Sequence, residues 1–159
     1  MAGTIRDRLK TRTARLGEVL GLAHLKAGQA NGQVIISGLT ITKGGTSNRQ
    51  VLVSAGECIM AGVIKTFAAV TATSLPSTVN TDASTYRKVL LEQSAAGALS
   101  FKVGTGAAAQ ADAALPALSS DKIAIGYLEL PPSFTADTTS LTDAMILQGP
   151  GTLTAFNAA

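Results

Sequence analysis

Residues 120–132 constrain the fold of this chain more than any other stretch. Apolar side chains occupy positions 123, 125, 127, 128 and 130, mostly in alternation, and include β-branched and aromatic types. Pro131 and Pro132 close the run, and proline has no N–H to donate to a sheet ladder. An apolar period of two predicts a half-buried strand that ends at Leu130, and therefore a chain organised around a β-sheet.

Further strand signals fill the region from residue 33 to 148, separated by turns rich in glycine, serine and proline. We expect strands over residues 34–41, 50–54, 86–93, 98–103 and 144–148. Residues 57–70 predict either one bent strand or a hairpin around Ala61-Gly62. Gly38 indicates a bulge inside the first strand, and Ala55-Gly56 indicates a tight turn.

The connections have their own signatures. Residues 94–97 predict the turn of a hairpin that joins the strands over 86–93 and 98–103. Residues 71–84 are rich in Ser, Thr and Pro and predict a loop. Residues 104–118 predict an extended surface connection, with a short alanine-rich helix over 107–114 as the alternative.

About seven short strands with regular turn signals predict a mainly β fold. The architecture we expect is an antiparallel β-sandwich or barrel, jelly-roll-like, with an N-terminal helical arm. The expected boundaries are a basic arm over residues 1–32, a β domain over 33–148 and a C-terminal tail over 149–159.

The helical arm rests on apolar residues that recur at helical spacing within 4–27. These residues are Ile5, Leu9, Leu16, Val19, Leu20 and Ala23. Gly17 and Gly21 each weaken a helix by about 1 kcal/mol relative to alanine. Two short helices, or an arm that orders only against a partner, are therefore alternatives. Asn31-Gly32 marks a turn after the arm.

Charge is concentrated in this arm. The chain has a formal net charge of +3, but residues 1–26 hold six basic and two acidic residues. Four net charges are few for a dedicated nucleic-acid binder, so we expect no nucleic-acid partner. Two interpretations stay open: a solvated helix face, or a docking surface in which arginine forks pair with carboxylates. The candidate partner-binding residues are Ile5, Arg6, Arg8, Leu9, Arg12, Arg15 and Leu16.

The sequence contains few residues in the patterns that catalytic, metal-binding or cofactor-binding sites require. His24 is the one histidine and has no cysteine or carboxylate at ligand spacing, which disfavours a zinc site and a Ser-His-acid triad. Gly104-x-Gly106 lacks the third glycine of a dinucleotide loop and favours a flexible loop. Cys58, the single cysteine, is interpreted as a small buried hydrophobe. We expect no enzyme activity, no catalytic residues, no metal and no cofactor.

The abundance of small side chains favours assembly of the chain into a larger complex. The chain contains no Trp and is rich in Ala, Thr, Gly and Ser, whose small side chains let backbones approach closely. That composition favours a homo-oligomer or a protein bound to a lattice. No run reaches the roughly 18 apolar residues of a membrane span, and no signal peptide fits the N-terminus, so we expect no membrane partner and assembly in a cytoplasm.

Several short sequence segments occur in a characteristic order within residues 33–147. They are Val53-Ser54-Ala55-Gly56 with Ala61-Gly62, then residues 67–73, 86–92 and 115–128, and finally Ser133-Phe134-Thr135 with residues 138–141. This order resembles that of tailed-bacteriophage virion proteins: capsid decoration (cement) proteins, head-fibre proteins and related minor components.

The resemblance implies a decoration protein that binds the outer surface of the phage head. Its partners would be the major capsid protein and copies of itself, with a trimer favoured over a dimer. It would bridge neighbouring capsid subunits, stabilise the shell on the virion exterior, and assemble in the bacterial host cytoplasm. A tail, neck or baseplate component and a host-surface or glycan-binding module are the alternatives. No catalytic residue is implied.

Overall fold

Antiparallel strands make up about half of the residues in the computed structural model, which describes residues 34–44, 49–80, 82–134 and 139–148. This confirms the mainly β prediction. The predicted helical arm over 1–32 and the tail over 149–159 lie outside the described residues.

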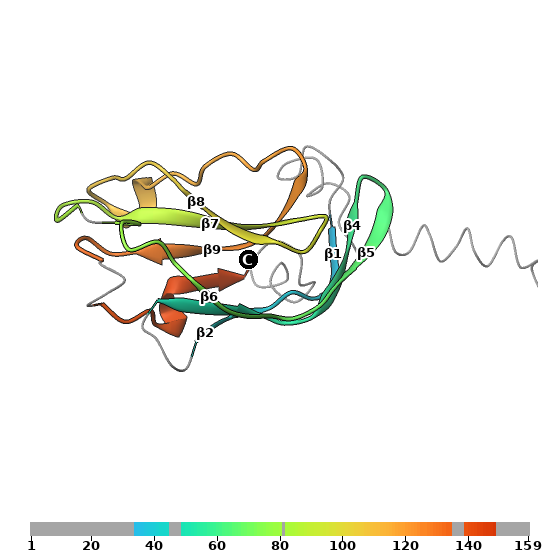
Figure 1. Cartoon of the computed structure of the whole chain (residues 1–159). Coiled ribbons are helices and arrows are strands. Elements are labelled where there is room, and N and C mark those ends of the chain that lie inside the picture. Colours follow the sequence, from blue (N-terminus) through green and yellow to red (C-terminus); the bar gives the residue numbers. More distant parts are fainter. Residues whose placement is uncertain (1–33, 45–48, 81, 135–138, 149–159) are drawn as a thin grey trace, which may run out of the picture.

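The first six strands form a meander that is bent at one corner. They are β1 Val34–Gly38, β2 Ile41–Lys43, β3 Gln50–Val53, β4 Gly56–Met60, β5 Val63–Phe67 and β6 Val70–Ser74. One three-stranded sheet has the order β1-β4-β5, and the other has the order β2-β3-β6. Only two residues separate β1 from β2, β3 from β4, and β5 from β6. The chain therefore crosses the corner three times and passes from one sheet into the other each time (Figure 1).

Close backbone contact shapes this corner. Gly38 and Gly56 pair directly across β1 and β4. A Cβ at Gly38 would lie 2.0 Å from the carbonyl oxygen of Ala55, and one at Gly56 would lie 2.3 Å from that of Ser37. The predicted tight turn at Ala55-Gly56 is wrong, because the chain bends there and continues into β4. The predicted first strand contains a bulge, but the register shift lies between Ile35 and Ser37 and not at Gly38, which ends β1.

A hairpin joins β4 to β5, as one of the two expectations for residues 57–70 had it. Met60 pairs with Val63, and the two turn residues, Ala61 and Gly62, have φ of 50° and 77°. Two positive φ values in a two-residue loop are typical of a type I′ turn. The loop predicted over 71–84 begins too early, because β6 continues to Ser74 and pairs with β3.

The remaining strands form a four-stranded sheet with the order β10-β9-β7-β8. They are β7 Arg87–Ser94, β8 Leu99–Val103, β9 Lys122–Leu130 and β10 Ile146–Gln148. The predicted β7–β8 hairpin is confirmed. The alternative of an alanine-rich helix over 107–114 is reduced to one 3₁₀ turn, η1 Gln110–Asp112, and a second turn, η2 Asp143–Met145, leads into β10.

A bulge in β9 explains why its apolar pattern breaks its alternation. Leu91 of β7 pairs with Gly126, whereas the next residue of β7, Glu92, pairs with Ala124. Ile125 is therefore an extra residue, and the side-chain phase changes there. As a result Ile123, Ile125, Leu128 and Leu130 all lie in the core.

One hydrophobic core lies between the four-stranded sheet and the bent meander. Figure 1 shows β7, β8 and β9 across from β2 and β6, with β1, β4 and β5 rising at one end. The Gln148 side chain joins the layers at one edge: its amide nitrogen donates to the carbonyl of Ile41 at 2.7 Å, and its oxygen accepts from the Ile41 N–H at 2.9 Å. The described strands do not close into a barrel.

Candidate interaction surface

The seven residues that the sequence nominates for partner binding precede the described part of the chain. Ile5, Arg6, Arg8, Leu9, Arg12, Arg15 and Leu16 all lie outside the described residues, as does His24. The first described residue, Val34, opens β1. The surface around Val34 is therefore the described surface nearest in sequence to those candidates.

An apolar row crosses the β1-β4-β5 sheet at Val34. Val34 pairs with Ile59, and Ile59 pairs with Ile64, so these three side chains share one face of the sheet. Ile64 is 63% exposed and is the most exposed of the large apolar side chains that the structure describes. Val34 and Ile59 are half-buried. We call Val34, Ile59 and Ile64 the apolar row, and the side of the sheet that carries them the outer face.

A polar row runs beside it on the outer face. Ser37 pairs with Glu57, and Glu57 pairs with Thr66. All three side chains are exposed, and the Thr66 hydroxyl donates to the Glu57 carboxylate at 3.5 Å. Glu57 is the one acidic residue within these three strands. The outer face is therefore apolar at one end and weakly acidic at the other.

The opposite face of the same sheet belongs to the core. Ile35 and Cys58 pair there, and both are buried. Burial raises the pKa of the Cys58 thiol, and the nearby Lys65 ammonium lowers it by a smaller amount. This position confirms the interpretation of Cys58 as a small buried hydrophobe.

A long connection, residues 104–121, covers the outward side of the four-stranded sheet, and we call it the strap. It begins where the N–H of Gly104 donates to the carbonyl of Lys88 at 2.8 Å. A Cβ at Gly104 would lie 2.0 Å from the carbonyl oxygen of Ala114. Gly104 therefore serves a close backbone contact. The strap is also held where the Lys102 ammonium donates to the carbonyl of Ala117 at 2.6 Å.

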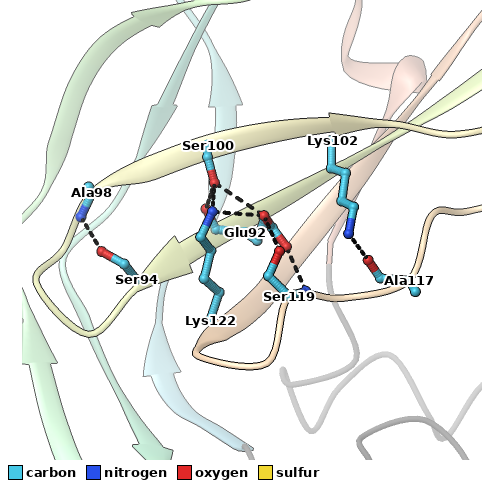
Figure 2. Close-up of polar contacts among 8 residues, drawn as sticks. All are labelled: Glu92, Ser94, Ala98, Ser100, Lys102, Ala117, Ser119 and Lys122. Carbon is cyan, nitrogen blue, oxygen red and sulfur yellow. Dashed lines mark hydrogen bonds and ion pairs between the residues drawn. The ribbon is translucent and has the colours of Figure 1, made fainter.

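The most buried charge in the described part of the chain fastens the end of the strap (Figure 2). Glu92 is 2% exposed and accepts from the Ser119 N–H at 3.1 Å and from the Ser119 hydroxyl at 3.0 Å. The Lys122 ammonium lies 3.0 Å from the same carboxylate and donates to the Ser100 hydroxyl at 2.9 Å. Sequence reasoning missed this cluster; its one signal was an acid that directly follows the apolar run Val89-Leu90-Leu91 of a predicted strand.

Electrostatics keep Glu92 ionised. Burial raises its pKa, but the hydrogen bonds from Ser119 and the ammonium of Lys122 together outweigh burial, so the pKa of Glu92 lies below its ordinary value. Both carboxylate oxygens are occupied by donors of the protein itself. The arrangement is that of a satisfied internal ion pair, which fixes a layer of the fold.

Other kinds of site find no support in the described ranges. Those residues contain no group of three or more His, Cys, Asp or Glu side chains placed to hold a metal ion. None of the helical segments in the same ranges is long and apolar enough to cross a membrane. The outer face of the β1-β4-β5 sheet is thus the candidate site that the geometry offers.

Comparison with known protein families, with curated proteins and with solved structures finds no match.

Proposed function

We propose that this chain is a capsid decoration (cement) protein of a tailed bacteriophage. It binds the outer surface of the head and bridges neighbouring major capsid subunits, acting through contact and without enzymatic turnover. The arm residues Ile5, Arg6, Arg8, Leu9, Arg12, Arg15 and Leu16 contact the shell or a neighbouring subunit. The protein works as a homo-oligomer, with a trimer favoured over a dimer.

The observation that carries this proposal is the outer face of the β1-β4-β5 sheet. It exposes Ile64 in the same row as Val34, the first described residue, with Ile59 between them. Exposed apolar side chains that are rimmed by polar ones are typical of protein interaction surfaces. By contrast, the buried acid Glu92 is occupied by internal partners. The geometry therefore supports a role in surface contact rather than a role in catalysis.

The resemblance of residues 33–147 to phage virion proteins supports the choice of partner. The finer fold that we propose is a jelly-roll-like β-sandwich, in which the four-stranded sheet and the bent meander form the two layers. Repeated shell subunits would let many weak contacts act together, because each further contact made by a tethered body is intramolecular. A modest interface per copy is then sufficient to stabilise a shell.

Two alternatives make different predictions. As a tail, neck or baseplate component, the chain would be present in a few or a dozen copies per virion, whereas a decoration protein would be present in hundreds. Quantitative mass spectrometry of purified virions measures this copy number. A host-surface or glycan-binding module would bind in a glycan array, although the scarcity of aromatic residues argues against sugar platforms.

The direct test is sedimentation with phage shells that lack this protein. We expect the wild-type chain to pellet with the shells, and a variant with Arg6, Arg8 and Arg12 all replaced by Glu to pellet several-fold less. Lys102→Glu is the charge-reversal control, because it reverses a charge on β8, outside the arm. Absence of wild-type co-sedimentation would reject the decoration function. Equal binding of both variants and wild type would reject the arm as the contact.

A further inference from the structure

We propose that the side of β5 that faces away from β4, which we call the β5 edge, accepts an added strand from another protein. This strand carries an acidic residue opposite Lys65, and the same lysine keeps a second copy of the present chain off the edge. An added strand would lie beside β5 in the plane of the sheet, so the outer face and its apolar row would stay open. The inference is therefore independent of the proposed contact with a phage shell.

The backbone of β5 has unused hydrogen-bonding groups at this edge. β5 pairs with β4, and no other described strand pairs with it (Figure 1). Met60 and Val63 flank a two-residue turn and therefore form a hydrogen-bonded pair, and such pairs alternate along an antiparallel ladder. Val63 and Lys65 thus direct their N–H and C=O groups to β4. Those of Ile64 and Thr66 point to the β5 edge, where a further strand would bond them.

The other sheet edges are less suited to pairing. β1 contains the bulge described above, and β6 shifts its register against β3 and holds Ala72 at a φ of 54°. Such irregularities turn an edge away from a partner strand. In β2 the N–H and C=O of Ile41 are already bonded to the Gln148 side chain, β10 has only three residues, and in β8 the Lys102 side chain is tied to the strap. β5 pairs with β4 without any register shift.

Apolar exposure is also greatest on β5. Ile64 is 63% exposed and Val63 is 55% exposed, the two highest values among the large apolar side chains that the structure describes. The strand contains neither proline nor glycine. A regular, exposed and apolar edge strand is a template for pairing with another chain.

Lys65 determines which strand can pair. It lies in the middle of β5, is half-buried, and makes no ion pair with the described residues. If two copies of β5 paired so that every edge group was bonded, Ile64 would pair with Thr66 of the second copy. Each Lys65 would then face the other in a non-hydrogen-bonded pair, with the Cα atoms about 4.5 Å apart. Like charges directly opposite each other destabilise such a ladder, so a second copy is excluded.

An acidic residue opposite Lys65 reverses the sign of this interaction. Oppositely charged cross-strand pairs stabilise a ladder, and an apolar residue opposite Ile64 would add contact on the outer face. In an antiparallel strand these two positions are adjacent. The partner that fits is therefore an extended protein segment with an acidic residue next to an apolar one, bound mainly through its backbone.

The chain itself supplies such a strand once the charge of Lys65 is reversed. Lys65→Glu places a carboxylate in the middle of β5, so this variant should associate with the wild type. We expect sedimentation velocity of an equimolar mixture to show a species of higher mass than either protein forms alone, with association several-fold tighter than that of either protein with itself. Lys102→Glu is the matched control, because it changes the net charge equally but lies on β8; its mixture with the wild type should show no such species.

A proline distinguishes strand addition from other kinds of association. Thr66→Pro removes an N–H that points to the β5 edge and leaves the hydrogen bonds between β4 and β5 in place. Added to the Lys65→Glu chain, it should abolish association with the wild type, while circular dichroism shows that the fold is retained. Ile64→Pro removes the other edge-facing N–H and replaces Thr66→Pro should the latter fail to fold.

Each outcome decides the matter. Association of the mixture that the proline removes supports the proposal. A mixture that does not associate overturns it. Association that survives the proline, or that Lys102→Glu shows equally, overturns it in favour of general charge attraction. Association of the wild type with itself that Thr66→Pro removes overturns it in favour of a second copy at this edge.

Discussion

Replacing Glu92 by glutamine removes a buried charge while keeping the size of the side chain. The amide oxygen of Glu92→Gln can still accept a hydrogen bond from Ser119. The ion pair with Lys122 is lost, however, because an amide carries no charge to balance the ammonium. The substitution therefore isolates the electrostatic part of the cluster in Figure 2.

The expected cost follows from the burial of the two partners. Breaking a buried ion pair by removing one charge typically costs about 3–5 kcal/mol. The Lys122 side chain is 25% exposed and can regain some hydration, which places the loss at the lower end, about 3 kcal/mol. For a chain of this length, a loss of that size lowers the Tm by roughly 6–12 °C.

Urea denaturation measures this loss of stability. Far-UV circular dichroism follows the unfolding, because the chain contains no tryptophan for a fluorescence signal. The control is Lys102→Met, which removes an exposed hydrogen bond to the same strap and should cost less than about 1 kcal/mol. A Glu92→Gln variant that unfolds within about 0.5 kcal/mol of wild type, the scatter of ordinary surface substitutions, would refute the role assigned to the ion pair.

Three further predictions use the same denaturation assay. Because the pKa of Glu92 in the folded protein lies below its ordinary value, the ionised carboxylate stabilises the fold above about pH 4.3, and this stabilisation is lost as the pH falls further. Glu92→Gln should therefore lose less stability at acid pH than the wild type does, and an equal loss would contradict this role of Glu92. Gly104→Ala should cost about 3 kcal/mol through collision with the Ala114 carbonyl, whereas Gly62→Ala, in open space, should cost about 1 kcal/mol from its positive φ; equal losses would disprove the close contact. Cys58→Ser should cost about 1–3 kcal/mol by burying a hydroxyl yet leave the fold and assembly intact, and loss of assembly would show a further role.

Local patterns carried the prediction of individual strands. The alternation before Pro131 located β9, and the turn signals located the β7–β8 hairpin and gave the β4–β5 hairpin as one of two alternatives. These features depend on residues that are close in the sequence, so propensity and periodicity contain the information. The break in the alternation of β9 was visible too, but its cause was not. The bulge at Ile125 is defined by the register against β7, which no local pattern specifies.

The bent corner could not be predicted from the sequence for a physical reason. Ala55-Gly56 has the composition of a turn, and a glycine there has two possible explanations: a positive φ or a close backbone approach. The structure shows the second, since Gly56 meets the carbonyl oxygen of Ser37, a residue of another strand. Only the pairing of β1 with β4 distinguishes the two explanations. The same limit applies to Gly104 and the strap.

The choice of candidate surface rests on a difference between two sheets: a second layer covers the outward side of the four-stranded sheet, and no described segment covers that of the β1-β4-β5 sheet. Val89–Gln93 of β7 is buried on both faces, although an antiparallel sheet commonly leaves one face to solvent. The strap supplies the second layer there, and Glu92 fixes it through Ser119 and Lys122. The β1-β4-β5 sheet has no such layer among the described residues, and its outer face exposes Ile64. A dedicated, ion-paired segment covers one sheet of this fold, whereas the outer face of the β1-β4-β5 sheet stays exposed among the described residues, and that is the face on which we propose further contacts.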